Sequence, residues 1–290
     1  MNQEEQNYLN LLYDIIVNGN ERQDRTGVGT KSIFGTKLKF SLEDSKIPLL
    51  TTKKMFLRGI IEELLFFIRG ETNTKLLEEK GVNIWKGNTS REFLDSRGLS
   101  HYPEGEMGPM YGYQWRNFGK NKFWSGVNEL GEDEYFETDG VDQLANVIDL
   151  LKNDPYSRRI MVTAYNPQAS NQSVLEPCHV LFQLYVKGDE LSLQYYQRSV
   201  DCFLGLPFNI CSYAILAHIL AKVSGLKAKE LIFVGGDSHL YSSHFEQAEE
   251  QINRQPFPFP QLIINKEIAT MEDIEKLEFE DLELKNYQAH

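Results

Sequence analysis

The sequence has few cysteines, no excess of positive charge and no apolar run that approaches membrane-spanning length. Its 3 cysteines in 290 residues lack paired spacing, which argues against a disulfide framework and predicts a reducing, cytoplasmic compartment. The formal net charge of -12 disfavours a nucleic-acid backbone or an anionic membrane as the main partner. Any anion that the protein binds must therefore meet a local cluster of basic residues.

The chain is long enough to bury a full core, and no linker divides it. We therefore predict a single domain over residues 1–290. The polar, glycine-bearing run at 119–140 is interpreted as a surface insertion. His218, His239 and His244 share no ligand-like spacing with one another or with a cysteine pair, so no metal site is predicted.

Apolar residues at helical spacing predict a mixed helix-and-strand protein. Helices are expected over 4–18, 54–69 and 141–152, and a buried helix is expected from Phe208 to near Gly225. The strand LIFVGG follows that helix, another helix is expected to open at Asp237 or Ser238, and two short strands are expected after residue 261.

The stretch from Leu175 to Asn209 contains the outline of a reaction centre. The runs HVLFQLYV and ELSLQYY are typical of two strands joined by the turn Lys187–Asp189. A hairpin of that length returns the chain close to Cys178 as it reaches Arg198. Because a guanidinium group lowers the pKa of a nearby thiol and holds anions, Cys178 is a candidate activated nucleophile.

An isolated cysteine is more often a small buried apolar residue than a nucleophile, and we interpret Cys202 and Cys211 in that way. Cys178 differs because it follows Pro177 and precedes His179. The later run GLPFN is expected to form a rigid turn that opens a helix, with Asn209 as a possible cap.

Other candidate residues are scattered along the chain. Glu62 and Glu63 interrupt an apolar helix pattern, where a carboxylate against aromatic walls has a raised pKa and suits proton transfer; the alternative is a surface charge pair. Trp85, beside Asn88, is either core or a stacking platform for a flat ligand, and Tyr111 offers a hydroxyl near it.

Three further places carry groups that suit a nucleotide. Arg25 precedes two glycines in a loop that either wraps a phosphate or forms an ordinary hairpin. Arg158 and Arg159 stand at a strand entry, as a solvated edge or a phosphate site. His239 and Tyr241 are two positions apart; they would point to different faces of a helix but converge at a frayed helix start.

Several blocks together resemble the thymidylate synthase family. They occur in the family's order and cover nearly the whole chain: DRTGVGT, TTKKMFLRGIIEELLFFIRGETN, GVNIW, GPMYGYQWR, DPYSRRI, EPCHVLFQLYV, YYQRSVDCFLGLPFNICSYAILA and GGDSHLY. The resemblance implies an α+β fold, a large mixed β-sheet flanked by helices, with the sheet packing at a homodimer interface. It also implies reductive methylation of dUMP to dTMP, with 5,10-methylenetetrahydrofolate as donor of the carbon and the hydride.

The resemblance implies a role for each candidate residue. Cys178 would add to C6 of the uracil ring, Glu63 would manage protons with Tyr111 and His179 nearby, and Asn209 would hydrogen-bond the pyrimidine edge. Asp201 and Arg198 complete the implied catalytic group. The implied dUMP site comprises Arg25, Gln197, Arg198, Ser199, Asp201, Asn209, His239 and Tyr241, with Arg158 and Arg159 donated by the second subunit. The implied folate wall comprises Ile84, Trp85, Asn88, Asp201, Gly205 and Phe208.

The sequence departs from the family pattern at a few places. Family members usually continue beyond a Tyr-x-x-His element with a proline and a short apolar tail, whereas this sequence stops at His290. We expect either that the sequence is a shortened form of the protein or that closure and turnover are weakened. Lys86, Glu176 and Ser243 are expected to tune affinity. Two alternatives remain: a sister enzyme that yields 5-hydroxymethyl-dUMP, which Asn209 also fits, and a non-catalytic RNA-binding dimer, which the net charge of -12 disfavours.

Overall fold

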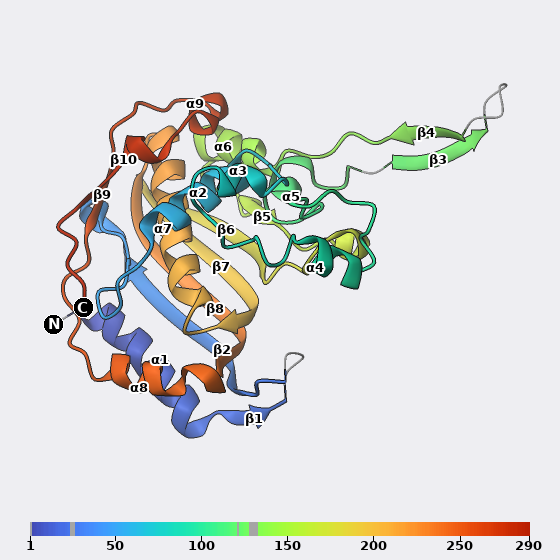
Figure 1. Ribbon diagram of the computed structural model, residues 1–290. Coiled ribbons are helices and arrows are strands. Elements are labelled where there is room, and N and C mark those ends of the chain that lie inside the picture. Colours follow the sequence, from blue (N-terminus) through green and yellow to red (C-terminus); the bar gives the residue numbers. More distant parts are fainter. Residues whose placement is uncertain (1, 24–26, 121, 128–132) are drawn as a thin grey trace.

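The computed structural model describes residues 2–290 except 24–26, 121 and 128–132, and side chains are described outside 121–137. Its centre is a six-stranded sheet with the strand order β1-β2-β8-β7-β6-β5 (Figure 1). Neighbouring strands run antiparallel except β7 and β8, which are parallel. The sheet strands are β1 (Asn20–Arg22), β2 (Thr30–Ser41), β5 (Met161–Thr163), β6 (His179–Lys187), β7 (Glu190–Asp201) and β8 (Lys227–Tyr241).

Helices cover one face of this sheet (Figure 1). The central one, α7, packs against β7 and β8, and α2 packs against α7. The α-helices are α1 (Gln3–Asn18), α2 (Leu57–Ile68), α3 (Lys75–Glu78), α4 (Arg91–Ser96), α5 (Gly112–Asn117), α6 (Gln143–Asn153), α7 (Gly205–Val223), α8 (Phe245–Ile252) and α9 (Met271–Glu275). The 3-10 helices are η1 (Glu43–Ser45), η2 (Pro167–Gln172), η3 (Ser242–His244) and η4 (Phe279–Asp281). The predicted α+β class, with a large mixed sheet flanked by helices, is confirmed.

The two remaining strand pairs lie outside the main sheet. Hairpin β3–β4 (Lys122–Val127 and Asp133–Glu137) projects from the body within the stretch interpreted as an insertion (Figure 1). Part of that stretch lies outside the described residues. The pair β9–β10 (Gln261–Ile264 and Leu282–Lys285) confirms the two short strands predicted after residue 261.

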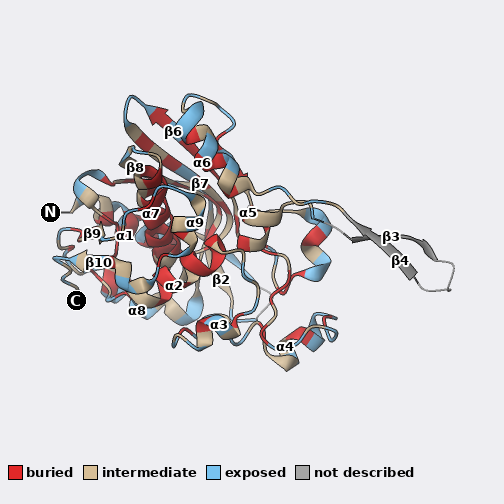
Figure 2. Ribbon diagram, turned by 90° about the horizontal axis from the view of Figure 1, so that it is seen from above, coloured by how far each residue is buried: buried red, intermediate tan, exposed pale blue. Residues whose placement is uncertain are grey.

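Helix α7 forms the centre of the core, and Figure 2 shows it buried between the sheet and the other helices. By length and composition alone it could cross a membrane, because its most apolar window has a mean hydropathy of 1.4. The expectation that no apolar run approaches that length is therefore wrong for this helix. Within the protein 78% of that window is buried, so α7 has the environment of a core helix.

Two local predictions are wrong. Residues 237–241 do not open a helix, because β8 continues through them, paired with β2 as far as Tyr241 and with β7 as far as His239. Asn209 is not a helix cap, because α7 already begins at Gly205. The N–H groups of Phe203 and Leu204, just ahead of the helix, are instead bound by the Asp201 carboxylate, each at 3.0 Å.

Candidate active site

Cys178 lies directly before β6, at the open end of the β6–β7 hairpin and away from its turn. His179 is opposite Gln197 in the strand register, as predicted for a returning chain. The carbonyl of Cys178 accepts a hydrogen bond from the backbone N–H of Arg198 at 2.9 Å, and its own N–H donates to the Tyr111 hydroxyl at 3.0 Å. The cysteine is half-buried, whereas Cys202 and Cys211 are fully buried, as predicted.

The expected lowering of the Cys178 pKa is wrong in its net direction. Arg198 and Tyr111 do lower the pKa of the thiol, but burial outweighs them and raises it. The Arg198 guanidinium donates to the carbonyls of Pro177 and Glu176, both at 3.0 Å, so it also holds the turn that precedes the cysteine. The ligand-free thiol is therefore protonated at neutral pH and next to the cation that favours its ionisation.

Tyr111 connects the cysteine to an aromatic wall. Its backbone has φ 42° and ψ -106°, a conformation that non-glycine residues rarely adopt and that strained functional positions often show. Its ring lies 4.9 Å from that of His179, 5.0 Å from that of Phe67 and 6.0 Å from that of Trp85. Burial raises the pKa of its hydroxyl well above the usual value, so the group acts as a neutral hydrogen-bonding partner.

The two glutamates of α2 have different surroundings. Glu62 is only 3% exposed and is ion-paired with Arg58 and Lys80. Glu63 accepts a hydrogen bond from Trp85 Nε1 at 2.8 Å, and burial raises the pKa of its carboxyl to about 7. The alternative of a solvated surface pair is wrong. Glu63 can exchange a proton near neutral pH, which is the property predicted for one of the two.

A set of buried polar side chains faces the same region. Gln197 Nε2 donates to Asn209 Oδ1 and to the carbonyl of Ser199, both at 3.1 Å. Gln197 Oε1 is buried without a hydrogen-bond partner among the described residues, so it offers an acceptor to a ligand or a water. Burial lowers the pKa of His179 to about 4, against a hydrogen bond with Asn209, so this imidazole is neutral.

The parallel pair β7–β8 brings a second group together. Asp201 and His239 are partners in the strand register. His239 and Tyr241 lie two positions apart on a strand and therefore share a face, with their rings edge to face at 5.3 Å. His239 Nδ1 is 3.2 Å from Asp237 Oδ1, which fixes the ring orientation.

The beginning of α7 joins these two groups. A side-chain carbon at Gly205 would lie 3.6 Å from the Cβ of Asp201 and 3.8 Å from Asn209 Oδ1, so the three positions are neighbours. Phe208 is half-buried against the core on the same helix. The arrangement therefore combines a thiol, a proton-exchanging carboxyl, an oriented amide and a histidine–tyrosine pair around the ends of β6, β7 and β8.

Comparison with known proteins decides the family. The family model described as thymidylate synthase matches residues 6–290. The chain belongs to the thymidylate synthase family. It is 49% identical over 289 residues to the bifunctional dihydrofolate reductase-thymidylate synthase of Plasmodium berghei (strain Anka), covering 100% of this chain and 47% of that protein.

Two further relatives show the same extent of similarity. The bifunctional dihydrofolate reductase-thymidylate synthase of Leishmania major is 46% identical over 291 residues, covering 100% of this chain and 54% of that protein. The probable thymidylate synthase of Schizosaccharomyces pombe (strain 972 / ATCC 24843) is 45% identical over 297 residues, covering 100% of this chain and 46% of that protein. The chain thus spans about half the length of the curated relatives that it matches.

Other residues implied by the thymidylate synthase resemblance are exposed or half-buried. Arg158 and Arg159 are exposed ahead of β5, and Arg158 lines a cavity of about 530 Å³ on the sheet. Ile84 is 41% exposed, and Asn88 is half-buried in the turn after Trp85. Arg25 lies outside the described residues.

Lys53 is a candidate that the sequence reasoning missed. Its ammonium group donates to the Phe203 carbonyl at 2.5 Å and lies 4.1 Å from the centre of the Phe203 ring. Burial lowers its pKa to about 8, against the attraction of Asp201. The only sequence signal is a pair of lysines after two threonines, which does not distinguish a site lysine from a surface one.

The backbone before Lys53 is held by a buried carboxylate, which the sequence reasoning also missed. Glu5 on α1 is 0% exposed, and its two oxygens accept hydrogen bonds from the backbone N–H groups and the hydroxyls of Thr51 and Thr52 at 2.7 to 2.8 Å. Within the described part of the chain, no group of three or more His, Cys, Asp or Glu side chains has a geometry that could hold a metal ion.

Proposed function

We propose that this chain converts dUMP to dTMP and uses 5,10-methylenetetrahydrofolate as the donor of the one-carbon unit and the hydride, yielding dihydrofolate. The observation that carries the proposal is the half-buried Cys178, which is hydrogen-bonded to Tyr111 and Arg198. Tyr111 in turn packs against Trp85, which holds the Glu63 carboxyl of pKa about 7. Membership of the thymidylate synthase family supports the same reaction.

Cys178 is the proposed nucleophile. Its thiolate adds to C6 of the uracil ring and makes C5 a carbon nucleophile; the folate supplies the methylene carbon and then the hydride, and the thiolate leaves when the ring double bond re-forms. Because burial raises the pKa of the thiol, ionisation depends on the nearby Arg198 and on the Tyr111 hydroxyl, both of which lower that pKa.

Glu63 is the proposed proton carrier. Its pKa of about 7 allows it to give a proton to the substrate oxygen O4 and to accept one during loss of the C5 hydrogen, through ordered water. Trp85 fixes the orientation of its carboxyl. The neutral His179 and the neutral Tyr111 complete the hydrogen-bond network without adding charge.

Asn209 is the proposed reader of the base. An amide can accept from uracil N3–H and donate to O4, and the hydrogen bond from Gln197 holds the amide in one orientation. His239 and Tyr241 share a strand face, where they suit a single deoxyribose 3′-hydroxyl. Asp201 and the half-buried Trp85 and Phe208 suit the pterin and its flat ring system, and Ile84, Asn88 and Gly205 are proposed to complete the folate site.

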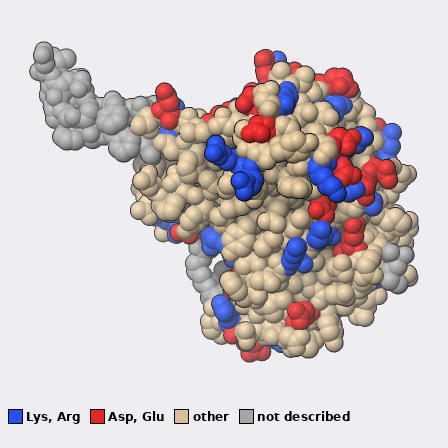
Figure 3. Space-filling model, turned by 180° about the vertical axis from the view of Figure 1, so that it is seen from behind, with Lys and Arg blue, Asp and Glu red and all other residues tan. Residues whose placement is uncertain are grey.

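The phosphate site is proposed to need two subunits. Arg198 and Ser199, with Arg25, would hold the phosphate from one subunit, and Arg158 and Arg159 from its partner. Figure 3 shows the side of the molecule away from α7, where charged side chains are sparse over broad areas.

A second copy of the chain is the proposed cover of this sheet face. Along β6, Leu184 and Val186 are buried while Gln183 and Tyr185 are exposed, Tyr185 by 68%. Gln183 and Tyr185 line the same cavity as Arg158. A homodimer packed here would therefore place Arg158 at the subunit boundary, and we propose this assembly in a reducing, cytoplasmic setting.

Incubation with 5-fluoro-dUMP and the folate tests the proposal. Because fluorine cannot leave C5 as a proton does, a stable covalent ternary complex is expected on Cys178, detectable by intact mass and peptide mapping. Cys178→Ala should abolish both the complex and dTMP formation, and the matched Cys202→Ala variant should retain them. Chromatography of the product separates dTMP from 5-hydroxymethyl-dUMP. Product formation by the Cys178→Ala variant would overturn the proposal.

A further inference from the structure

The segment from Lys80 to Trp85 contacts two consecutive residues of helix α2, Glu62 and Glu63. Lys80 Nζ lies 2.8 Å from Glu62 Oε2, and Trp85 Nε1 lies 2.8 Å from Glu63 Oε1. The contact of Lys80 with Glu62 is an ion pair that takes no part in the proposed reaction. The contact of Trp85 is with Glu63, the proposed proton carrier. A segment of six residues thus spans from a structural contact to a catalytic one.

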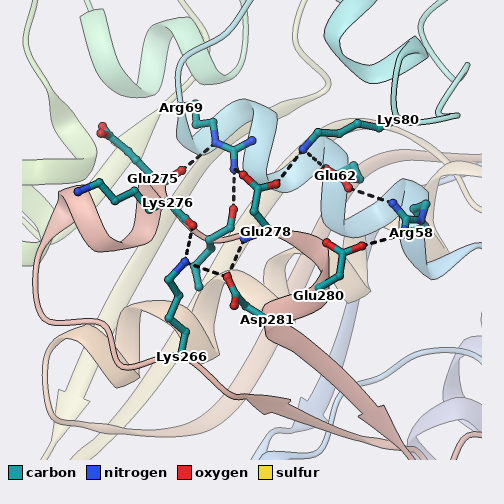
Figure 4. Close-up of polar contacts among 11 residues, drawn as sticks. Arg58, Glu62, Arg69, Lys80, Lys266, Glu275, Lys276, Glu278, Glu280 and Asp281 are labelled. Atoms are coloured by element: carbon teal, nitrogen blue, oxygen red, sulfur yellow. Dashed lines mark hydrogen bonds and ion pairs between the residues drawn. The ribbon is translucent and has the colours of Figure 1, made fainter.

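Glu62 is the fixed end of this attachment. Its carboxylate is 3% exposed, and a buried carboxylate requires charged partners. Arg58, one turn earlier on α2, approaches it at 3.4 Å, so Lys80 provides the shorter contact. Figure 4 shows that Lys80 also reaches Glu278, at 3.1 Å, and that Arg58 reaches Glu280 from the same C-terminal segment.

The segment between the two contacts is short and is anchored in the core at Val82, while its other residues are exposed. Val82 is 1% exposed, and its N–H donates to the Leu77 carbonyl at 2.9 Å. The carbonyl of Trp85 accepts from the Thr89 N–H at 3.1 Å. Because only four residues separate the two contacts and Val82 among them is fixed in the core, a shift at Lys80 is carried to the Trp85 indole and, through its edge contact at 6.0 Å, to Tyr111.

We propose that Lys80 is a positioning residue for the proposed reaction: through its ion pair with Glu62 it holds the segment 80–85 so that Trp85 orients the carboxyl of Glu63. This inference rests on the proposed function, since it is Glu63 that is assigned to proton transfer. Lys80 itself is not placed in contact with a substrate or a cofactor.

Replacement of Lys80 tests the inference. Lys80→Met should lower kcat for dTMP formation about 10-fold while KM for dUMP changes less than about twofold, because proton transfer is affected and nucleotide contacts are not. Lys80→Arg should restore kcat to within about twofold, since it keeps the charge and the reach. Glu62→Gln should also lower kcat, because it removes the charge of the same ion pair and keeps the shape of the side chain. This variant tests the inference if Lys80→Met does not fold.

Glu278→Gln is the matched control, because it removes the other ion pair of Lys80 and leaves the pair with Glu62. It should leave kcat unchanged. A readout independent of activity is acrylamide quenching of Trp85, taken as the difference between each protein and the same protein with Trp85→Phe. Quenching should rise in Lys80→Met and stay at the parent level in Lys80→Arg and Glu278→Gln.

Several results would overturn the inference. They are unchanged kcat and Trp85 quenching in Lys80→Met, failure of Lys80→Arg to restore them, or an equal loss of kcat in Glu278→Gln. If the parent protein forms no dTMP, the proposed function fails, and the quenching series still decides whether Lys80 positions Trp85.

Discussion

Replacement of Glu63 by Gln separates the contribution of this carboxyl to turnover from its effect on the free energy of unfolding. The amide keeps an oxygen that can accept from Trp85 Nε1 but cannot ionise. In the folded protein the pKa of Glu63 is about 7, against an ordinary value of 4.5. The unfolded chain therefore releases this proton first as the pH rises, and the folded form carries the penalty of ionising a buried group.

The direction and the size of the change in stability with pH follow from this difference in pKa between the folded and the unfolded chain. The contribution of Glu63 to stability is most favourable below pH 4.5 and is lost as the pH rises through 7. Between pH 5 and pH 8 the free energy of unfolding of the parent should fall by about 2.5 kcal/mol relative to that of Glu63→Gln, since each pKa unit corresponds to about 1.4 kcal/mol. Other titrating groups, His179 included, are present in both proteins and cancel in the difference.

Urea unfolding of both proteins at pH 5, 6, 7 and 8, at one protein concentration, measures this difference. Turnover of Glu63→Gln should fall about 100- to 1,000-fold over the same range, as is typical for loss of a general acid–base group. Glu71→Gln, at an exposed glutamate just past α2, is the control and should change neither property. Parallel stability curves for the parent and Glu63→Gln would refute the reasoning.

Four further predictions concern other parts of the structure. Cys178→Ala should lose all dTMP formation while its thermal midpoint changes by less than about 3 °C, because the thiol is half-buried just before β6. Asn209→Asp should lose turnover of dUMP and gain binding of dCMP, measured by calorimetry with both nucleotides, since a carboxyl replaces the donor that suits uracil O4. Tyr195→Phe should unfold at the same or slightly higher urea concentration, because the Tyr195 hydroxyl is buried without a partner among the described residues; a loss above about 1 kcal/mol would contradict this. Glu5→Gln should cost about 3 kcal/mol in the same assay, because its carboxylate accepts four short hydrogen bonds.

The parts of the fold with strong local patterns could be predicted from the sequence. The alternation along β7 and the turn at Lys187–Asp189 predicted the hairpin that returns Arg198 to Cys178, and apolar composition predicted the buried helix α7. These elements were predictable because the local pattern and the tertiary environment favour the same structure.

The sequence reasoning failed where tertiary contacts outweigh local signals. The polar residues Asp237 and Ser238 are typical helix starts, but pairing on both sides extends β8 through them. Asp201 provides the cap-like bonds that were assigned to Asn209. The helix pattern around Glu62 and Glu63 does not show which carboxyl pairs with Lys80 and which accepts from Trp85, because both partners follow in a separate segment.

Most residues of the candidate site were assigned from short sequence motifs, whereas no motif indicated Lys53. The proximity of Arg198 to Cys178 was predicted, but the burial that outweighs its effect on the thiol pKa depends on packing by distant elements. Lys53 gave no distinctive signal, because its lowered pKa results from burial, and the residue that it contacts, Phe203, comes 150 positions later in the chain.

The parallel pairing of β7 and β8 has a consequence for how the chain tolerates changes in length. Parallel neighbours require a crossover, and here α7 provides it, beginning only four positions after β7 ends. One inserted residue between Asp201 and Gly205 would rotate the whole helix and displace Asn209 from the base. Insertions and deletions should therefore accumulate in the protruding β3–β4 hairpin, far from this crossover, and be absent from the β7–α7 junction.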